Sequence, residues 1–368
     1  MNDGTGAARG RNRGTAGRQA GRASKPQVTI YDVARDAGVS FGTVSRVLNG
    51  RRDVSEKTRA RVLESIQRLN YVSHPFARGL ARRSTGLVGF VSGGARSSGD
   101  RHSYYALEMQ QGVLRGAGDA GYNVVILDPE NAHPKTIESF SRLVEGVIVR
   151  GNMPDVLKEQ LDPKVPVVGI NSPNVQPSVR VDHESGAREA VLHLVELGHR
   201  RIALVPGTGR GASSARLARE AAYRSVLDQC NLAYDPALHS DSIDINKPHK
   251  LHRVLDGFLS LDDPPTAIFV GGDTLALETI NYLAERGIRV PGDISIVGSS
   301  DLPIGALALP SLSTVHIPLA KMAERAAEML AELIRDPSTA IADESFTTRL
   351  IVRGSSGPPS GCRKEASP

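Results

Sequence analysis

The sequence predicts an α/β protein with an N-terminal helix-turn-helix headpiece and a core of two doubly wound parallel-sheet lobes. Two observations lead to this prediction. Between residues 28 and 83, three short helical patterns follow one another, and each begins with its own capping residue. From Gly86 on, short apolar runs alternate with amphipathic segments, which is typical of parallel sheets covered on both faces. The runs are too many for one compact sheet, so two lobes are expected.

The 368 residues divide into predicted segments of different composition. The first residues are rich in Gly, Ala and Arg with almost no large apolar side chain, which predicts a disordered arm that either adds phosphate contacts or only aids solubility. The end of the chain is rich in Gly, Pro and Ser and has no leucine heptad. The predicted segments are a basic arm (1–26), a helix-turn-helix domain (27–72), a hinge helix (73–84), a core (85–357) and a flexible tail (358–368).

The first two helical patterns have the signals of a helix-turn-helix. Thr29 and Asp32 have the spacing of a capping box, in which each side chain satisfies a backbone N–H of the first turn. Ser40 and Ser55 are expected to be the N-caps of the next two helices. Gly38 stands where a tight turn joins the first helix to the second, a position that usually needs a positive φ. Two helices joined in this way predict a DNA-reading module.

The second helix is expected to present one face to a major groove. Val44, Val47 and Leu48 have the i, i+3, i+4 spacing of a buried face. On the opposite face, Arg46 is the best candidate for direct base readout, because a guanidinium pairs bidentately with guanine, and Phe41 is placed to press on a thymine methyl. The alternative is a generic three-helix unit that binds protein and leaves Arg46 solvated. The opposite face consists of Phe41, Gly42, Ser45, Arg46 and Asn49.

Charge divides along the same boundary. Through Arg83 the chain has 17 basic and 6 acidic residues, a net charge of +11, while the remainder has 28 basic and 34 acidic residues, a net charge of −6. A basic head on an acidic body attracts phosphate backbones and makes binding salt-dependent. The two cysteines, Cys230 and Cys362, have no CxxC or metal spacing, and there is neither a secretory h-region nor an 18-residue apolar stretch. A cytoplasmic protein without a membrane span, metal or cofactor is expected.

The headpiece resembles that of the lac repressor family, which reads T-x-x-D-V-A-x-x-A-G-V-S-x-x-T-V-S-R-V-L-N-G. This pattern runs here from Thr29 to Gly50, and Leu69-Asn70-Tyr71 also matches. Gly42 departs from it, because the family often has a polar specificity residue there, so more discrimination should fall on its neighbours. The resemblance and the predicted reading face together imply these DNA contacts: Thr29, Ser40, Phe41, Gly42, Thr43, Ser45, Arg46, Asn49, Tyr71, Ala77 and Leu80.

Residues 73–83 resemble the family's hinge helix. Ala77, Arg78 and Leu80 match its A-R-x-L core, which implies that Leu80 is a wedge inserted into the minor groove. Gly79 departs from the pattern and costs about 0.5–1 kcal/mol relative to alanine in a helix. So short a helix is expected to fold only on DNA, beside that of a dimer partner. The alternative is an ordinary linker with one apolar residue.

The resemblance extends, more loosely, to about residue 357 and implies a core like that of periplasmic binding proteins. In this family the chain crosses between the lobes three times. The first lobe is therefore expected over about 85–182 and 315–340, and the second over about 183–313 and 341–357. Ligands of doubly wound folds bind at the carboxyl ends of strands, so an effector is expected in the cleft between the lobes.

Several residues match effector-facing positions of the family. Arg219 corresponds to the arginine of an R-x-x-G-Y motif in which Ala222 replaces the glycine, and its planar fork suits hydroxyls or a carboxylate. Ser300 stands where characterised members have an aspartate. Asp273 has two open interpretations, a ligand contact or a cap of the following helix. The implied effector-binding residues are Tyr104, Tyr105, Asn171, Arg219, Asp273, Ser300 and Asp301.

The resemblance implies a homodimeric transcriptional regulator, a repressor that binds a pseudo-palindromic operator in double-stranded DNA. Its effector would be a small molecule, a sugar or sugar derivative with a purine-like or phosphorylated compound as the alternative, that changes the angle between the lobes. The alternative is a soluble receptor of the periplasmic type without DNA regulation. An enzyme is not expected, because the histidines are scattered and no catalytic constellation or complete P-loop occurs.

Overall fold

The computed structural model describes residues 28–48, 51, 53–71, 84–92, 104–129, 132–207, 213–243 and 248–360. The chain divides into two compact units, and the division falls between residues 81 and 82 of the sequence. The predicted arm, and all of the predicted hinge helix except residue 84, lie outside the described residues. No helix in the described ranges is long and apolar enough to cross a membrane.

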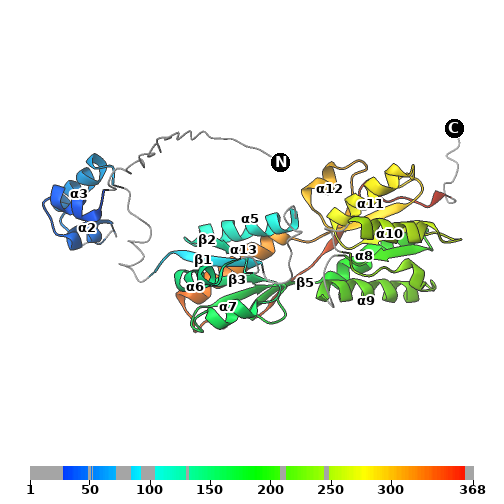
Figure 1. Cartoon of the computed structure of the whole chain (residues 1–368), viewed down its shortest axis with the longest axis horizontal. Helices are drawn as coiled ribbons and strands as arrows, with labels where there is room; N and C mark the ends of the chain where they lie inside the picture. Colours follow the sequence, from blue (N-terminus) through cyan, green and yellow to red (C-terminus); the bar gives the residue numbers. More distant parts are fainter. Residues whose placement is uncertain are drawn as a thin grey trace, which may run out of the picture. The chain divides into compact units, whose positions relative to one another are not determined.

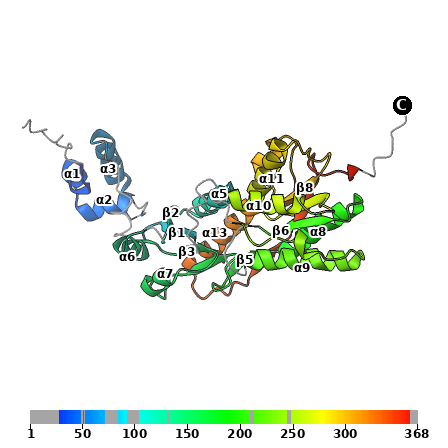
Figure 2. The same cartoon turned by 45° about the vertical axis from the view of Figure 1, so that its right-hand side comes forward.

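The first unit contains three short helices around a small apolar core (Figure 2). They are α1 (Ile30–Asp36), α2 (Phe41–Leu48) and α3 (Glu56–Arg68). The predicted caps are confirmed. Thr29 and Asp32 form a capping box, while the Ser40 and Ser55 hydroxyls accept hydrogen bonds from backbone N–H groups three residues on. Each such cap stabilises its helix by about 1 kcal/mol. The buried core consists of Val33, Ala34, Ala37, Val44, Val47, Val54 and Val62.

The second unit contains two doubly wound sheets, as predicted (Figure 1). The strand order of the first sheet is β10-β5-β4-β3-β1-β2, and every pairing in it is parallel. Helices α5 (Tyr104–Asp119) and α13 (Leu319–Arg335) contribute to one buried cluster of this lobe, and α6 (Pro134–Leu143) and α7 (Asp155–Gln160) to the other. The strands are β1 (Leu87–Ser92), β2 (Asn123–Leu127), β3 (Val147–Arg150), β4 (Val167–Ile170), β5 (Ser178–Val181) and β10 (Glu344–Phe346).

The second sheet has the order β11-β9-β8-β7-β6, with only β11 antiparallel to its neighbour. Helices α8 (His183–Glu196) and α9 (Ser214–Gln229) contribute to one buried cluster, and α10 (Pro248–Leu259) and α11 (Asp273–Glu285) to the other. The short helices η2 (Pro236–Leu238) and α12 (Pro303–Leu307) complete this lobe. Its strands are β6 (Ile202–Val205), β7 (Ala267–Val270), β8 (Ser295–Ser300), β9 (Ser313–His316) and β11 (Arg349–Ile351).

Two lobe boundaries differ from those expected near residues 314 and 340. Strand β9 pairs with β8, so the chain stays in the second lobe until residue 316, and strand β10 pairs with β5, so it stays in the first lobe until residue 346. The crossings therefore fall at 317–318 and 347–348. The expected bounds came from the family resemblance and were approximate, and the pairing of β9 and β10 places both crossings several residues later.

Candidate functional site

The headpiece presents one face of α2 to solvent. Val44 and Val47 are buried on the opposite face, as their spacing predicted, and Leu48 packs beside them. Arg46 and Phe41 are exposed. Gly42 is not required by packing, because a Cβ there would meet only the Ser40 hydroxyl, at 3.8 Å. The groove-facing side of this helix is therefore open to a partner.

Exposed contacts orient the two candidate reading side chains. The Phe41 ring stacks on Tyr31 of α1, with ring centroids 5.2 Å apart and an interplanar angle of 20°. The Arg46 Nε lies 3.9 Å from a carboxylate oxygen of Asp53, and both side chains are more than half exposed. An exposed ion pair of this kind contributes little, so DNA would displace Asp53 at small cost. Tyr31 was not among the predicted contacts, because its partner lies on another helix.

The other predicted DNA contacts divide into groups. Thr29, Ser40 and Thr43 take part in caps: the Thr29 hydroxyl bonds Asp32 at 2.6 Å, and the hydroxyls of Ser40 and Thr43 are 3.0 Å apart. Ser45 lies on α2 and Tyr71 just beyond α3, both half-buried. Their contacts with DNA stay predictions. Asn49, Ala77 and Leu80 lie outside the described residues.

The second unit contains a cavity of about 260 Å³ between its lobes, hereafter the inter-lobe cavity. The carboxyl ends of strands β3, β4, β7 and β8 and the first turns of helices α5, α8, α9 and α11 surround it. This is where doubly wound folds bind ligands. Its lining residues are Tyr105, Arg150, Asn171, His183, Ser213, Ala215, Arg219, Gly271, Gly272, Asp273, Thr274, Leu275, Ser300 and Leu302.

Local capping fixes the helices that carry two of these side chains. The Asp182 carboxylate caps α8 by accepting from the backbone N–H groups of residues 184 and 185, both at 3.1 Å, and so places His183 at the cavity. The Ser213 hydroxyl caps α9 by accepting from the Arg216 N–H. One turn beyond Arg219, the buried Tyr223 hydroxyl donates to the carbonyl of Ile202 at 2.8 Å and anchors α9 on β6.

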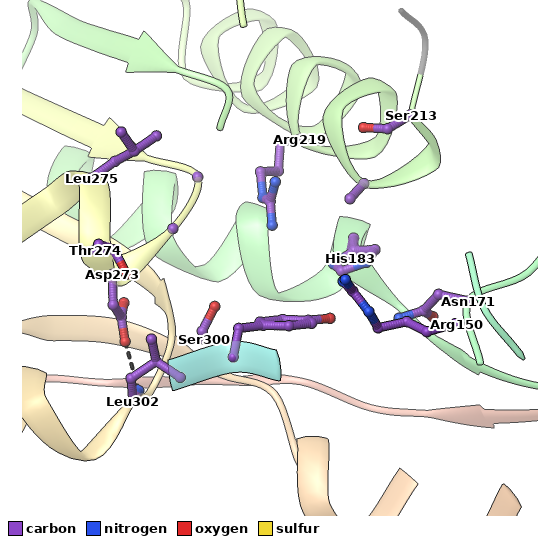
Figure 3. Close-up of a pocket in the computed structure, with 14 residues that line it drawn as sticks. Arg150, Asn171, His183, Ser213, Arg219, Asp273, Thr274, Leu275, Ser300 and Leu302 are labelled. Atoms are coloured by element: carbon purple, nitrogen blue, oxygen red, sulfur yellow. Dashed lines mark hydrogen bonds between the residues drawn. The ribbon is translucent and has the colours of Figure 1, made fainter. Parts of the chain in front are cut away.

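Arg219 brings a buried positive charge to the cavity. Its side chain points from α9 toward the middle of the space, with His183 and Ser300 facing it (Figure 3). The residue is 8% exposed and donates to the carbonyl of Pro206 at 3.1 Å. Burial lowers the pKa of Arg219 to about 10, which leaves the guanidinium protonated at neutral pH. A Cβ at Gly207 would lie 3.1 Å from its NH1, so a small residue is needed beside the guanidinium.

His183 is neutral at physiological pH. Burial, together with the nearby Arg219 charge, lowers the pKa of His183 to about 3, although Asp182 acts in the opposite direction. A neutral imidazole offers one hydrogen-bond donor and one acceptor. On this side of the cavity lie also Arg150 and Asn171, opposite Asp273 and Leu275 (Figure 3). The Asn171 Oδ1 accepts from the N–H of Val181 at 3.0 Å, which ties the residue to β5.

Asp273 is the acidic residue of the lining, and both of its oxygens are engaged outside its own helix. Oδ2 accepts from the N–H of Leu302 at 2.7 Å, and Oδ1 accepts from the Thr314 hydroxyl at 2.5 Å (Figure 3 draws the first). Burial raises the pKa of Asp273, although these two hydrogen bonds oppose the rise. The carboxylate therefore connects α11 to the segment after β8 and to β9 and does not cap α11, while its role as a ligand contact stays a prediction.

Asp301 lies just beyond the lining. Its carboxylate accepts from Arg353 at 2.6 Å and pairs with the Nδ1 of His316 at 2.8 Å. Burial opposes its ionisation, but the hydrogen bonds from Arg353 and His316 outweigh burial and hold the pKa of Asp301 below its usual range. With Ser300, Leu302 and His316 it also lines a second cavity, of about 240 Å³.

Comparisons with known proteins identify the family. The model of bacterial regulatory proteins of the lacI family matches residues 29–74, and that of the periplasmic binding protein-like domain matches residues 191–356. Catabolite control protein A of Priestia megaterium is 34% identical over 303 residues, which are 79% of this chain and 88% of that protein. The chain belongs to the lacI family. The relatives that it matches are transcriptional regulators and not enzymes, in agreement with the expectation from sequence that the chain is not an enzyme.

Solved lacI-family structures support the same fold. The structure of the lac repressor dimer bound to operator and the anti-inducer ONPF has a TM-score of 0.74 and 26% identity, and it covers 90% of this chain and 99% of that one. The complex of the transcriptional regulator CelR with cellobiose has a TM-score of 0.64 and 28% identity, covering 89% of this chain and all of that one. The predicted headpiece and two-lobed core are thus confirmed.

The structure brings most of the predicted effector-binding residues of this lacI-family chain around one cavity. Tyr105, Asn171, Arg219, Asp273 and Ser300 line it, whereas Tyr104 and Asp301 do not. Their roles toward a ligand stay predictions. Other lining residues were not predicted, although two of them had a signal in the sequence. Arg150 directly follows the apolar residues 146–149, at the end of β3, and His183 directly follows Asp182, the capping residue of α8. The polar lining residues not predicted are Arg150, His183, Ser213 and Thr274.

Proposed function

We propose that the chain is a homodimeric transcriptional repressor whose affinity for a pseudo-palindromic DNA operator is set by a small molecule, a sugar or sugar derivative, in the inter-lobe cavity. One observation supports this above the others: the same chain joins a helix-turn-helix headpiece to a cavity whose lining comes from both lobes. A periplasmic-type receptor needs the cavity but has no use for the headpiece.

The exposed face of α2 supports sequence-specific DNA binding. Arg46 is exposed, and among the described residues its side chain makes a weak ion pair with Asp53 that a guanine edge could replace; Phe41 supplies an exposed apolar surface on the same helix. The net charge of +11 up to Arg83 supplies phosphate contacts that position the headpiece. The lac repressor relative is solved on its operator, which is consistent with this role.

A ligand that touches both lobes is able to couple the cavity to DNA. Arg150 and Asn171 belong to the first lobe, and Arg219 and His183 to the second. Such a ligand binds one angle between the lobes more tightly than another, and its differential affinity limits how far it shifts the equilibrium. The first lobe begins directly after the predicted hinge, so a change in that angle would alter the hinge of each subunit.

An apolar surface on the first lobe supports dimerisation. Leu107 and Leu114 are seven residues apart on α5, and they are 47% and 50% exposed. Ile126, also 50% exposed, lies on β2, the edge strand of the sheet. Exposed apolar side chains gathered on a helix and an edge strand mark an interaction site, and we assign this one to a second copy of the chain.

The test starts from the purified full-length protein. Operator sequences are selected from random duplexes, and fluorescence anisotropy then measures operator affinity with and without metabolites that raise the melting temperature. We expect nanomolar, salt-dependent binding to a pseudo-palindrome and a change of affinity with at least one stabilising metabolite. Ligand binding with no sequence-selective DNA binding would instead support the receptor alternative.

A further inference from the structure

Among the described residues, no carboxylate pairs with the buried Arg219 of the inter-lobe cavity. This guanidinium is more than nine-tenths buried, and the carbonyl of Pro206 is the acceptor that it bonds. Within the ranges that the structure describes, no carboxylate lies within ion-pair distance of it. Nearby Ser213 and Ala215, on the same helix, contribute no charge to the lining. A guanidinium has five N–H donors, so most of this fork is left for a ligand.

The acidic residue of the lining does not compensate this charge. Both oxygens of Asp273 accept short hydrogen bonds, from the Leu302 N–H and the Thr314 hydroxyl, and the side chain is 1% exposed. It lies on the far side of the cavity from His183 in Figure 3. Each oxygen of the Asp273 carboxylate therefore has a hydrogen-bond donor other than Arg219.

Three further polar residues of the lining lie around the guanidinium: Tyr105, which acts against the effect of burial on the Arg219 pKa, and Ser300 and His183, which face it; none of the three is a carboxylate. Ser300 presents a hydroxyl where a carboxylate would attract the arginine and repel an anion. His183 stays uncharged because burial and Arg219 both disfavour its protonation, so it is a hydrogen-bond partner and not a competing cation. The side of the cavity around Arg219 therefore combines one desolvated positive charge with neutral donors.

A desolvated charge without a partner is costly, and buried charges in proteins are normally paired. Resting on the proposed function, we propose that the effector is a small anion, a carboxylate or phosphate derivative of sugar size, whose charged group pairs with Arg219. A bidentate pair with the planar fork then uses donors that a neutral sugar would satisfy only in part. The cavity volume of about 260 Å³ suits one small metabolite.

The test compares matched ligands on the full-length protein. Calorimetric titrations use three related sets: glucose with glucuronate and glucose 6-phosphate, galactose with galacturonate, and inorganic phosphate against chloride at equal ionic strength. We expect at least one anion to bind about 10- to 100-fold more tightly than its neutral parent. Carboxylate and phosphate sources are distinguished by which member of a set binds.

Three variants locate the binding charge. Arg219→Gln removes the charge and Ser300→Asp places a competing carboxylate opposite it; each should weaken the anion about 10-fold or more. Arg224→Gln is the matched control, because Arg224 lies on the same helix but stacks on Tyr234 outside the lining, so its variant should bind as the parent does. Ser300→Asp keeps the test decisive if Arg219→Gln does not fold.

The outcomes separate this proposal from the proposed function. Anion binding that both cavity variants weaken and the control preserves would support it. A neutral sugar that binds at least as tightly as its anionic partners and releases operator would overturn the anion assignment while leaving the repressor function standing. Anion affinity that is unchanged in Arg219→Gln, or no measurable binding of any anion in the sets, would also overturn the anion assignment. Operator affinity of the ligand-free protein, measured alongside, tests the repressor function independently.

Discussion

Replacing Arg219 with methionine should stabilise the ligand-free protein or leave its stability unchanged. This is the reverse of what removal of a buried, bonded side chain normally does. The reason is the missing counter-charge: the guanidinium is buried, and among the described residues it bonds only the carbonyl of Pro206. Methionine has a similar length and an unbranched, adaptable side chain, so it fills the space beside Gly207 without a charge.

The structure sets the magnitude of this effect. The pKa of Arg219 is lowered from 12.5 to about 10, chiefly by burial, which corresponds to roughly 3 kcal/mol of cost for keeping the charged form in place. Loss of the hydrogen bond to Pro206 opposes this gain by about 1.5–3 kcal/mol. The expected change in the free energy of unfolding therefore lies between about zero and 1.5 kcal/mol in favour of the variant.

Urea unfolding of the ligand-free full-length protein, followed by circular dichroism, measures this difference. The slope of the free energy with urea should be the same in both proteins, since the buried surface does not change. Arg224→Met, which loses an exposed cation–π contact with Tyr234, controls for loss of an arginine from α9. Destabilisation of Arg219→Met by more than about 2 kcal/mol would refute the reasoning, because it would mean that the guanidinium has a strong partner in the folded protein.

Three further predictions concern other surfaces of the molecule. Arg46→Ala should cost roughly 1–3 kcal/mol of operator binding in anisotropy titrations and leave random DNA bound as before; equal loss on both would make Arg46 a phosphate contact. Leu114→Asp should convert the dimer to a monomer in sedimentation experiments, and an unchanged dimer would exclude the α5 surface. The depressed pKa of Asp301 means that its carboxylate stabilises the fold above its unfolded pKa of about 3.9 and loses this effect as the pH falls toward its folded pKa. Asp301→Asn should flatten the fall in melting temperature between about pH 5 and pH 3, and an unaltered pH profile would contradict this.

Much of the fold was predictable because its signals are local. The capping box of Thr29 and Asp32 and the serine caps of α2 and α3 form as their spacing predicts. The apolar runs that alternate with amphipathic segments from Gly86 on became β1, β2, β3, β4, β6, β7 and β8. The short strands β5, β9, β10 and β11 were not predicted. Their sequences, SVRV, STVH, ESF and RLI, include polar residues and so are not the continuous apolar runs by which the other strands were recognised. Their pairing also depends on partners up to 165 residues away in sequence.

The residues of the site could be predicted only where they matched a motif of the family. Resemblance indicated Arg219, Asn171 and Ser300, and the structure brings them to one cavity. It did not indicate that Asp273 would bond Leu302 and Thr314, which lie 29 and 41 residues away, or that the described residues around Arg219 would include no carboxylate paired with it. The balance of charge in the cavity depends on side chains from both lobes, which lie far apart in sequence, so no local sequence pattern predicts it.

The segment from Ser300 to Leu302 connects the features on which regulation would depend. Ser300 and Leu302 line the inter-lobe cavity, and the Leu302 N–H is held by Asp273. Between them, Asp301 bonds His316, the last residue of β9, and the chain crosses to the first lobe immediately after it. A ligand that moves Ser300 must therefore also strain the ion pairs of Asp301 and the start of that crossing. Because these contacts are charged and partly buried, we expect that breaking them would oppose small displacements of the segment, and a ligand that shifts it would have to supply that cost.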